Sequence, residues 1–147
     1  MKIPSEYGTF KTKTLIVAAD SVHAKLFIAN GNEAAPLEII ESGWPPKGDP
    51  ERVSGQHGTV NFRETAETLK IQSREKLYHA LGKRLMALAQ EGTFDSLALC
   101  APAEHLDELK GSLHIDLLKR VTVSVPKLLT SEDMLDIVIH VREEAQG

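Results

Sequence analysis

The sequence predicts an α/β domain with a five-stranded mixed sheet flanked by helices, and three observations support this prediction. Three short apolar segments of strand-like composition follow one another near the N-terminus, with only turn residues between them. A segment rich in glycine and proline then separates them from a helical pattern of leucines. The rest of the chain alternates between strand-like and helix-like segments. This order is typical of an antiparallel meander that is extended by crossover connections into a mixed sheet.

Length and composition fit one domain. The chain has 147 residues, of which 41% are hydrophobic and 26% are charged, enough to bury a single core. We expect a polar N-terminal arm over residues 1–12 and one domain over residues 13–147. The formal net charge of −4 gives no global attraction for nucleic acid, so any such contact must be local.

The predicted strands of the meander are residues 14–19, 24–29 and 37–40. Asp20-Ser21 and Asn30-Gly31-Asn32 are the turn residues between them. Links this short require antiparallel neighbours. Residues 42–62 then form a long loop that contains several glycines and prolines, which break both helix and strand.

A long helix is predicted from about residue 64 and ends at Gly92, because leucines recur there at helical spacing. Lys70 and Arg74 would fall on its apolar side, so we expect either a kink or a helix that extends beyond the core. Five further elements are predicted along the chain: a strand at 96–100, a helix after Pro102, a short helix at 113–118, a strand at 121–125 and a final helix after the capping pattern at 130–133. The order βββ-α-β-α-β-α is that of ribonuclease H-like domains.

Location is predicted to be cytoplasmic. Cys100 is the one cysteine and lies in an apolar segment, so no disulfide within the chain is expected. Neither a secretory signal nor a stretch of 18 or more apolar residues is present in the sequence, and we expect no membrane partner.

Metal and cofactor chemistry is not indicated by the sequence. Asp20 follows the first strand, where a metal-dependent nuclease would place one carboxylate. The predicted strand at 96–100 supplies no second one, because it ends in Cys-Ala-Pro and Asp95 lies at its other end. We therefore expect Asp20 to cap a tight turn. The six histidines lack the spacing of a zinc site, and phosphate-loop and dinucleotide fingerprints are absent, so no metal and no cofactor are expected.

Three segments carry a resemblance to a known family. They are LIVAADSVHAKLF (residues 15–27), GTFDSLALCAP (residues 92–102) and VPKLLT (residues 125–130). They resemble the bacterial family called "protein required for attachment to host cells", over about residues 13–141. That family is similar to the central domain of archaeal and eukaryotic class 1 translation release factors, which implies a ribonuclease H-like arrangement without nuclease activity.

The resemblance also implies a role for the long loop. In those release factors the corresponding loop carries Gly-Gly-Gln, enters the peptidyl-transferase centre and helps to position a water against the peptidyl-tRNA ester. This chain has Gly55-Gln56 at that location, with Ser54 in place of the first glycine. Gln56 is therefore the candidate catalytic residue of a weak peptidyl-tRNA hydrolase activity. A noncatalytic RNA contact and a plain connector remain open alternatives.

The functional hypothesis is a translation-associated module that contacts the ribosome or tRNA. Its expected binding residues lie in the loop and on the exposed face of the long helix: Arg52, Gly55, Gln56, His57, Arg63, Lys76, His79 and Lys83. The alternative is a protein–protein interaction or regulatory protein that affects host attachment indirectly and has no ribosomal role. A homodimer through an exposed strand edge is a further open alternative.

Overall fold

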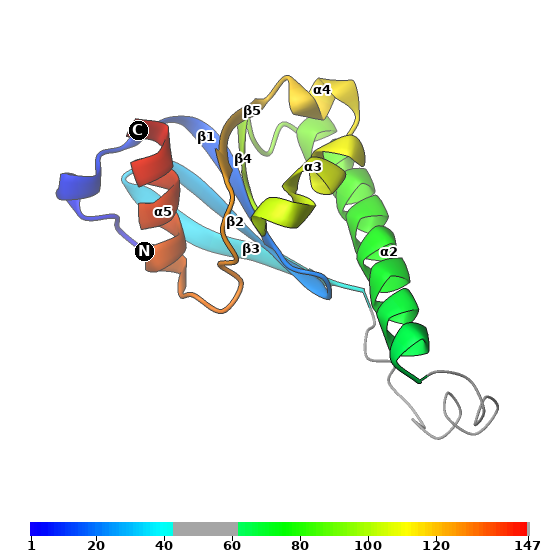
Figure 1. The fold of residues 1–147 in the computed structure, drawn as a ribbon. Coiled ribbons are helices and arrows are strands. Elements are labelled where there is room, and N and C mark those ends of the chain that lie inside the picture. The colour runs from blue at the N-terminus through cyan, green and yellow to red at the C-terminus, as the bar shows by residue number, and fades with distance from the viewer. Residues whose placement is uncertain (43–61, 147) are drawn as a thin grey trace.

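The computed structural model describes residues 1–42 and 62–146 of the chain (Figure 1). The strands are β1 (Phe10–Ala19), β2 (His23–Gly31), β3 (Glu33–Glu41), β4 (Ser96–Cys100) and β5 (Val121–Val125). The helices are a 3₁₀ turn η1 (Ser5–Tyr7), α2 (Phe62–Gln90), α3 (Ala103–Gly111), α4 (Ile115–Leu118) and α5 (Met134–Gln146).

The five strands form one mixed sheet in the order β3-β2-β1-β4-β5. β1 pairs antiparallel with β2, and β2 with β3, as the short turns require. β1 pairs parallel with β4, and β4 pairs parallel with β5. The chain between the paired strands contains α2 in the first case and α3 in the second, as crossover connections require. The predicted fold class and the element order are confirmed.

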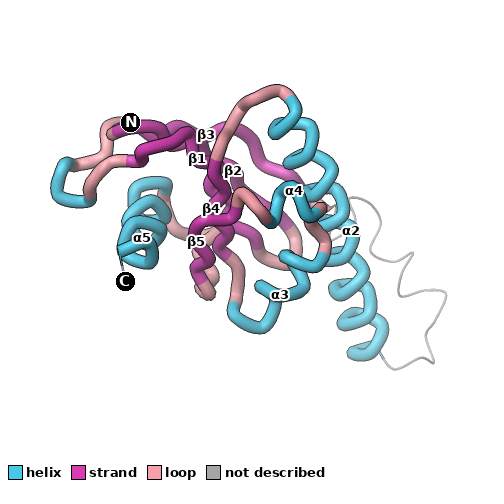
Figure 2. The backbone as a smooth tube through the Cα atoms, turned by 90° about the horizontal axis from the view of Figure 1, so that it is seen from above, coloured by secondary structure: helices cyan, strands magenta, loops and turns pink. Residues whose placement is uncertain are grey.

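Helices cover the two faces of the sheet as separate layers (Figure 2). α2, α3 and α4 pack on one face, against alternate residues of β1, β2 and β4 such as Leu15, Leu26 and Leu97. α5 and the N-terminal segment pack on the other face, over Ile16 and Ala98. Each strand therefore contributes to both cores, which explains why β1 is apolar without interruption from Leu15 to Ala19 and β4 from Leu97 to Cys100.

The N-terminal segment is packed more closely than a polar arm would be. β1 begins at Phe10, within the stretch expected as an arm, and its register shifts between Phe10 and Thr14. Ile3 is buried in the core under α5. The Arg142 guanidinium lies 5.2 Å from the centre of the Phe10 ring and donates a 3.0 Å hydrogen bond from Nε to the carbonyl oxygen of Tyr7.

α2 runs as a single helix, and its first turns extend past the end of the sheet (Figure 1). Of the two alternatives for Lys70 and Arg74, the structure thus shows the longer helix. Lys70 is exposed there. Arg74 is accommodated on the apolar side because its Nε donates a 2.8 Å hydrogen bond to Oε2 of Glu108 on α3.

β3 is one edge of the sheet. It contains Pro36, and the register shifts between Leu26 and Phe27 of its partner strand. Proline and bulges are features by which edge strands avoid pairing with a second chain. The edge gives no support for a homodimer.

Candidate functional site

α2 presents a basic face to solvent. Lys76, His79 and Lys83 are all exposed, opposite the side on which Leu81 and Leu85 are fully buried. The helical period of 3.6 residues separates the two sets. The lysines of this face are placed where they can contact phosphate without losing any packing.

The other predicted binding residues cannot be placed. Arg52, Gly55, Gln56 and His57 lie outside the described residues. Arg63 belongs to the first turn of α2, and its side chain also lies outside the described part.

A groove of about 530 Å³ runs between this face of α2 and the connection from α3 to α4. His79, Lys83 and Gln90 line it from α2, and Ser112 and His114 line it from the other side. His114 caps α4, because its Nδ1 accepts a 3.1 Å hydrogen bond from the backbone N–H of Asp116. His114 has no signal in the sequence as a binding residue, because only the tertiary packing brings it to the groove that Lys83 also lines.

Gly82 sets the width of this groove. A Cβ at position 82 would lie 3.0 Å from the carbonyl oxygen of Ser112. The Ser112 hydroxyl donates a 2.6 Å hydrogen bond to the carbonyl oxygen of Leu109, which holds that connection in place. The absence of a side chain at Gly82 therefore lets the α3–α4 connection lie directly on α2.

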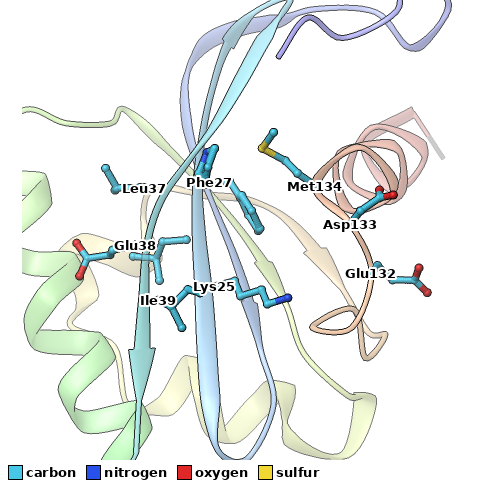
Figure 3. A pocket seen from close by; sticks show the side chains of 10 residues that line it. Lys25, Phe27, Leu37, Glu38, Ile39, Glu132, Asp133 and Met134 are labelled. Atoms are coloured by element: carbon cyan, nitrogen blue, oxygen red, sulfur yellow. The ribbon is translucent and has the colours of Figure 1, made fainter.

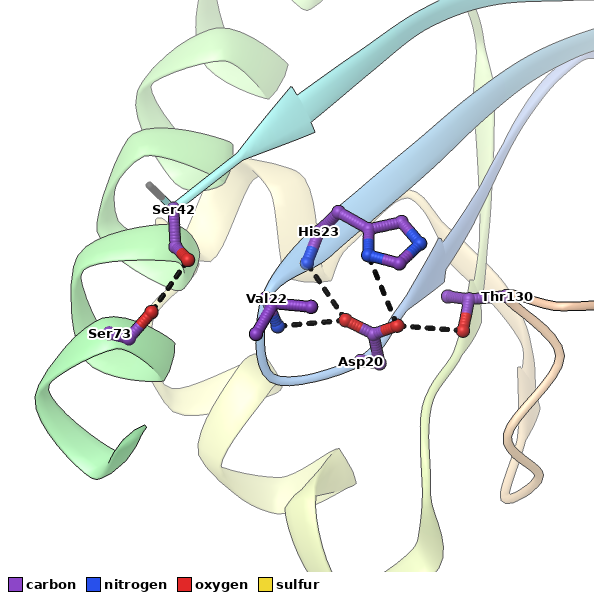
Figure 4. A network of polar contacts seen from close by, with 6 residues as sticks. All are labelled: Asp20, Val22, His23, Ser42, Ser73 and Thr130. Atoms are coloured by element: carbon purple, nitrogen blue, oxygen red, sulfur yellow. Dashed lines mark hydrogen bonds and ion pairs between the residues drawn. The ribbon is translucent and has the colours of Figure 1, made fainter. Parts of the chain in front are cut away.

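Asp20 is the centre of a polar network at the carboxyl end of β1 (Figure 4). Its Oδ1 accepts hydrogen bonds from the backbone N–H groups of Val22 and His23, at 2.7 and 2.8 Å. Its Oδ2 accepts one from the Thr130 hydroxyl at 2.8 Å and lies 3.3 Å from Nδ1 of His23. The expectation that Asp20 caps a tight turn is confirmed.

The same network bears on metal chemistry. Both oxygens of Asp20 are engaged by protein donors. Within residues 1–42 and 62–146, no group of three or more histidine, cysteine, aspartate or glutamate side chains is arranged to hold a metal ion. The described part of the chain therefore offers no candidate for two-metal phosphodiester chemistry.

Cys100 is not a candidate nucleophile. Its side chain is fully buried in β4, and burial raises the pKa of its thiol to about 12. A thiol with such a pKa stays protonated near neutral pH, and the protonated form is a poor nucleophile.

A second groove, of about 590 Å³, lies on the opposite face of the sheet (Figure 3). Phe27 of β2, Ile39 of the edge strand β3 and Met134 of α5 line its apolar part. Lys25, Glu132 and Asp133 add charges of both signs. This groove faces away from the basic face of α2, so the two surfaces are separate.

Comparison with protein families decides the classification. The model of bacterial archaeo-eukaryotic release factor family 12 matches residues 13–141, nearly the whole chain. The chain belongs to this family. Membership agrees with the release-factor-like resemblance of the sequence, whereas nothing in the match concerns host attachment.

Solved structures similar to this family 12 member have low identity to it. The archaeal translation termination factor aRF1 is 15% identical, with a TM-score of 0.49 and coverage of 86% of this chain and 36% of that chain. Dom34 of S. cerevisiae, a translation termination-like factor involved in RNA quality control pathways, is 11% identical, with a TM-score of 0.44 and coverage of 95% and 38%. The ethanolamine utilization protein EutJ from Carboxydothermus hydrogenoformans is 10% identical, with a TM-score of 0.43 and coverage of 90% and 48%.

The family 12 chain spans less than half the length of each of these proteins. At these identities and TM-scores the similarities carry no conclusion about activity. Comparison with curated proteins finds no match. None of the described helices is both long and apolar enough to span a membrane.

Proposed function

We propose that this family 12 protein is a translation-associated module that contacts the RNA of the ribosome or a bound tRNA. The observation that carries the proposal is the match of residues 13–141 to a release factor family. The proposed contact surface is the basic face of α2, defined by Lys76, His79 and Lys83, together with the segment that precedes the helix.

Local charge supports this surface. The chain as a whole carries a net charge of −4, which repels RNA at long range. Phosphate contact therefore depends on a place where basic side chains gather without acidic partners. Lys76 and Lys83 fit this requirement, because neither forms an ion pair within the described residues.

The finer proposal concerns the segment 52–63. We propose that it accompanies the basic face into the contact, with Arg52, His57 and Arg63 as further cationic groups. A hydrolytic role of Gln56 is the minority form of this proposal, because Ser54 stands where the release factors have the first glycine of Gly-Gly-Gln.

Co-sedimentation with purified ribosomes at low salt tests the proposal. We expect binding of the unaltered protein, weaker binding of Lys76→Ala/Lys83→Ala, and unchanged binding of the matched control Lys2→Ala/Lys11→Ala. Lys2 and Lys11 are exposed and lie outside α2, near the N-terminus and at the start of β1. A Gly55→Ala/Gln56→Ala variant tests the segment separately. Absence of binding at low salt would rule out the ribosomal role.

The alternative function is a protein–protein interaction that influences host attachment indirectly. The groove of Figure 3 favours it, because Ile39 is 59% exposed there beside Phe27 and Met134. This alternative predicts that Ile39→Lys reduces the adhesion of bacteria carrying the variant, while Lys76→Ala/Lys83→Ala does not. Reduced adhesion with Lys76→Ala/Lys83→Ala and normal adhesion with Ile39→Lys would reject this alternative.

A further inference from the structure

The groove between α2 and the α3–α4 connection has an apolar floor and a polar rim. Its volume of about 530 Å³ lies within the range of roughly 300–1,000 Å³ that ligand pockets span. Leu113 is buried and Met86 is half-buried, so these two side chains form the floor. The exposed lining residues His79, Lys83 and His114 belong to the rim. The groove can therefore hold a flat apolar group beside a cationic side chain.

The two sides of the rim differ in charge. Lys83 lies on the α2 side, with Lys76 two turns earlier on the same basic face, and neither forms an ion pair within the described residues. On the opposite side, Oδ2 of Asp116 lies 3.6 Å from Nδ1 of His114. Phosphate is attracted by the lysines and repelled by the Asp116 carboxylate. An anionic ligand therefore places its charge along α2 and its uncharged part against His114.

The imidazole of His114 is held in place at this rim. Its Nδ1 accepts the 3.1 Å hydrogen bond from the backbone N–H of Asp116, while the side chain remains 56% exposed. His79 presents a second exposed imidazole from α2. Unstacked RNA bases stack on aromatic side chains, histidine included, and a ring that is already fixed loses little conformational entropy on binding. His114 is therefore the better prepared of the two stacking surfaces.

The groove is elongated along α2. Its lining positions run from His79 to Gln90, which is about 16 Å at the rise of an α-helix. This length suits a strand of linked nucleotides better than one small molecule. Duplex RNA keeps its bases stacked inside the helix, so only a single strand offers bases to the apolar floor and phosphates to the lysines at once.

We propose that the groove binds single-stranded RNA, with unpaired bases against His114, His79 and the apolar floor and with the adjoining phosphates along Lys83 and Lys76. This inference rests on the proposed RNA contact and adds to it a selection for unpaired over duplex RNA. Stacking tolerates all four bases, so no sequence preference is expected.

Fluorescence anisotropy with the 147-residue chain tests the inference. One probe is labelled oligouridine of about 20 nucleotides, and the other is the same strand annealed to oligoadenosine. A contact with phosphates alone would favour the duplex, because the charge density of the duplex is higher. We expect instead that the single strand binds about tenfold more tightly than the duplex.

Variants of the two histidines separate base stacking from phosphate contact. His114→Asn removes the ring and keeps the helix cap, because asparagine is a favoured N-cap residue. It should weaken binding of the single strand about fivefold and change duplex binding much less. Stacking predicts that His79→Phe binds the single strand more tightly than His79→Lys, whereas a phosphate contact predicts the reverse order. Melting temperatures establish that each variant is folded.

Equal or tighter binding of the duplex would overturn the inference. An equal loss for both probes in His114→Asn would do the same, as would tighter single-strand binding by His79→Lys than by His79→Phe. In these cases, binding that falls with salt and is weakened for both probes by Lys76→Ala/Lys83→Ala leaves the proposed function standing. Absence of binding to both probes would also overturn the inference, and ribosome co-sedimentation then decides the proposed function separately.

Discussion

Thr130 donates a 2.8 Å hydrogen bond to Oδ2 of Asp20, a residue that lies 110 positions earlier in the chain (Figure 4). The contact joins the connection between β5 and α5 to the turn between β1 and β2. Both partners are largely removed from solvent, with Thr130 5% exposed. The carboxyl ends of β1 and β5 are therefore held together by a polar contact as well as by the apolar cores.

Asp20→Ala should lower the free energy of unfolding by about 2–3 kcal/mol. The substitution leaves the backbone N–H groups of Val22 and His23 and the hydroxyl of Thr130 without their acceptor. Urea unfolding followed by circular dichroism measures the loss. The control Asp107→Ala, at an exposed position of α3, should change stability by less than about 0.5 kcal/mol. Equal stability of the two variants would contradict the structural role of Asp20.

Gly82→Ala should lower stability by about 1 kcal/mol, although alanine normally favours a helix interior over glycine by about that amount. The added Cβ would lie 3.0 Å from the Ser112 carbonyl oxygen, whose backbone is fixed by its own hydrogen bonds. Gly111→Ala is the matched control, because nothing lies within 4 Å of a Cβ at that position. Thermal unfolding should show the control at or above the wild-type melting temperature. A melting temperature above the wild-type value in both variants would show that the α3–α4 connection moves aside easily, and would contradict the predicted loss for Gly82→Ala.

In alkaline solution the free energy of unfolding of the wild type should fall more steeply with pH than that of Tyr78→Phe. Burial raises the pKa of the Tyr78 phenol from 10.0 to about 12 in the folded chain. The folded state therefore binds the phenol proton more tightly than the unfolded state does. The resulting contribution to the free energy of unfolding is complete below pH 10 and is lost as the pH rises from about 10 toward 12. Denaturant unfolding of the wild type and Tyr78→Phe across this range isolates the contribution, because other groups titrate in both proteins. Parallel stability curves would contradict the assignment.

The fold was predictable because local signals agreed with one another. The turn residues at Asp20-Ser21 and around Gly31 allow only antiparallel neighbours, and the leucine spacing of α2 is unambiguous. The early start of β1 was missed because Lys11 and Thr12 belong to residues 1–12, which read as a polar arm. Their strand conformation depends on pairing with other segments, which local sequence does not encode.

The candidate site was only partly predictable. Helical periodicity suffices to place Lys76, His79 and Lys83 on an exposed face. His114 comes from the α3–α4 connection, and only the packing of that connection against α2 brings it to the groove that Lys83 also lines.

The most direct test of the central claim is the salt dependence of ribosome binding. The logarithm of the binding constant should fall linearly with the logarithm of salt concentration, and each lost phosphate contact should reduce the slope by about 1. We predict that Lys76→Ala/Lys83→Ala reduces the slope by about 2, whereas Lys2→Ala/Lys11→Ala leaves it unchanged. Equal slopes for wild type and both variants would contradict an RNA contact through the basic face of α2.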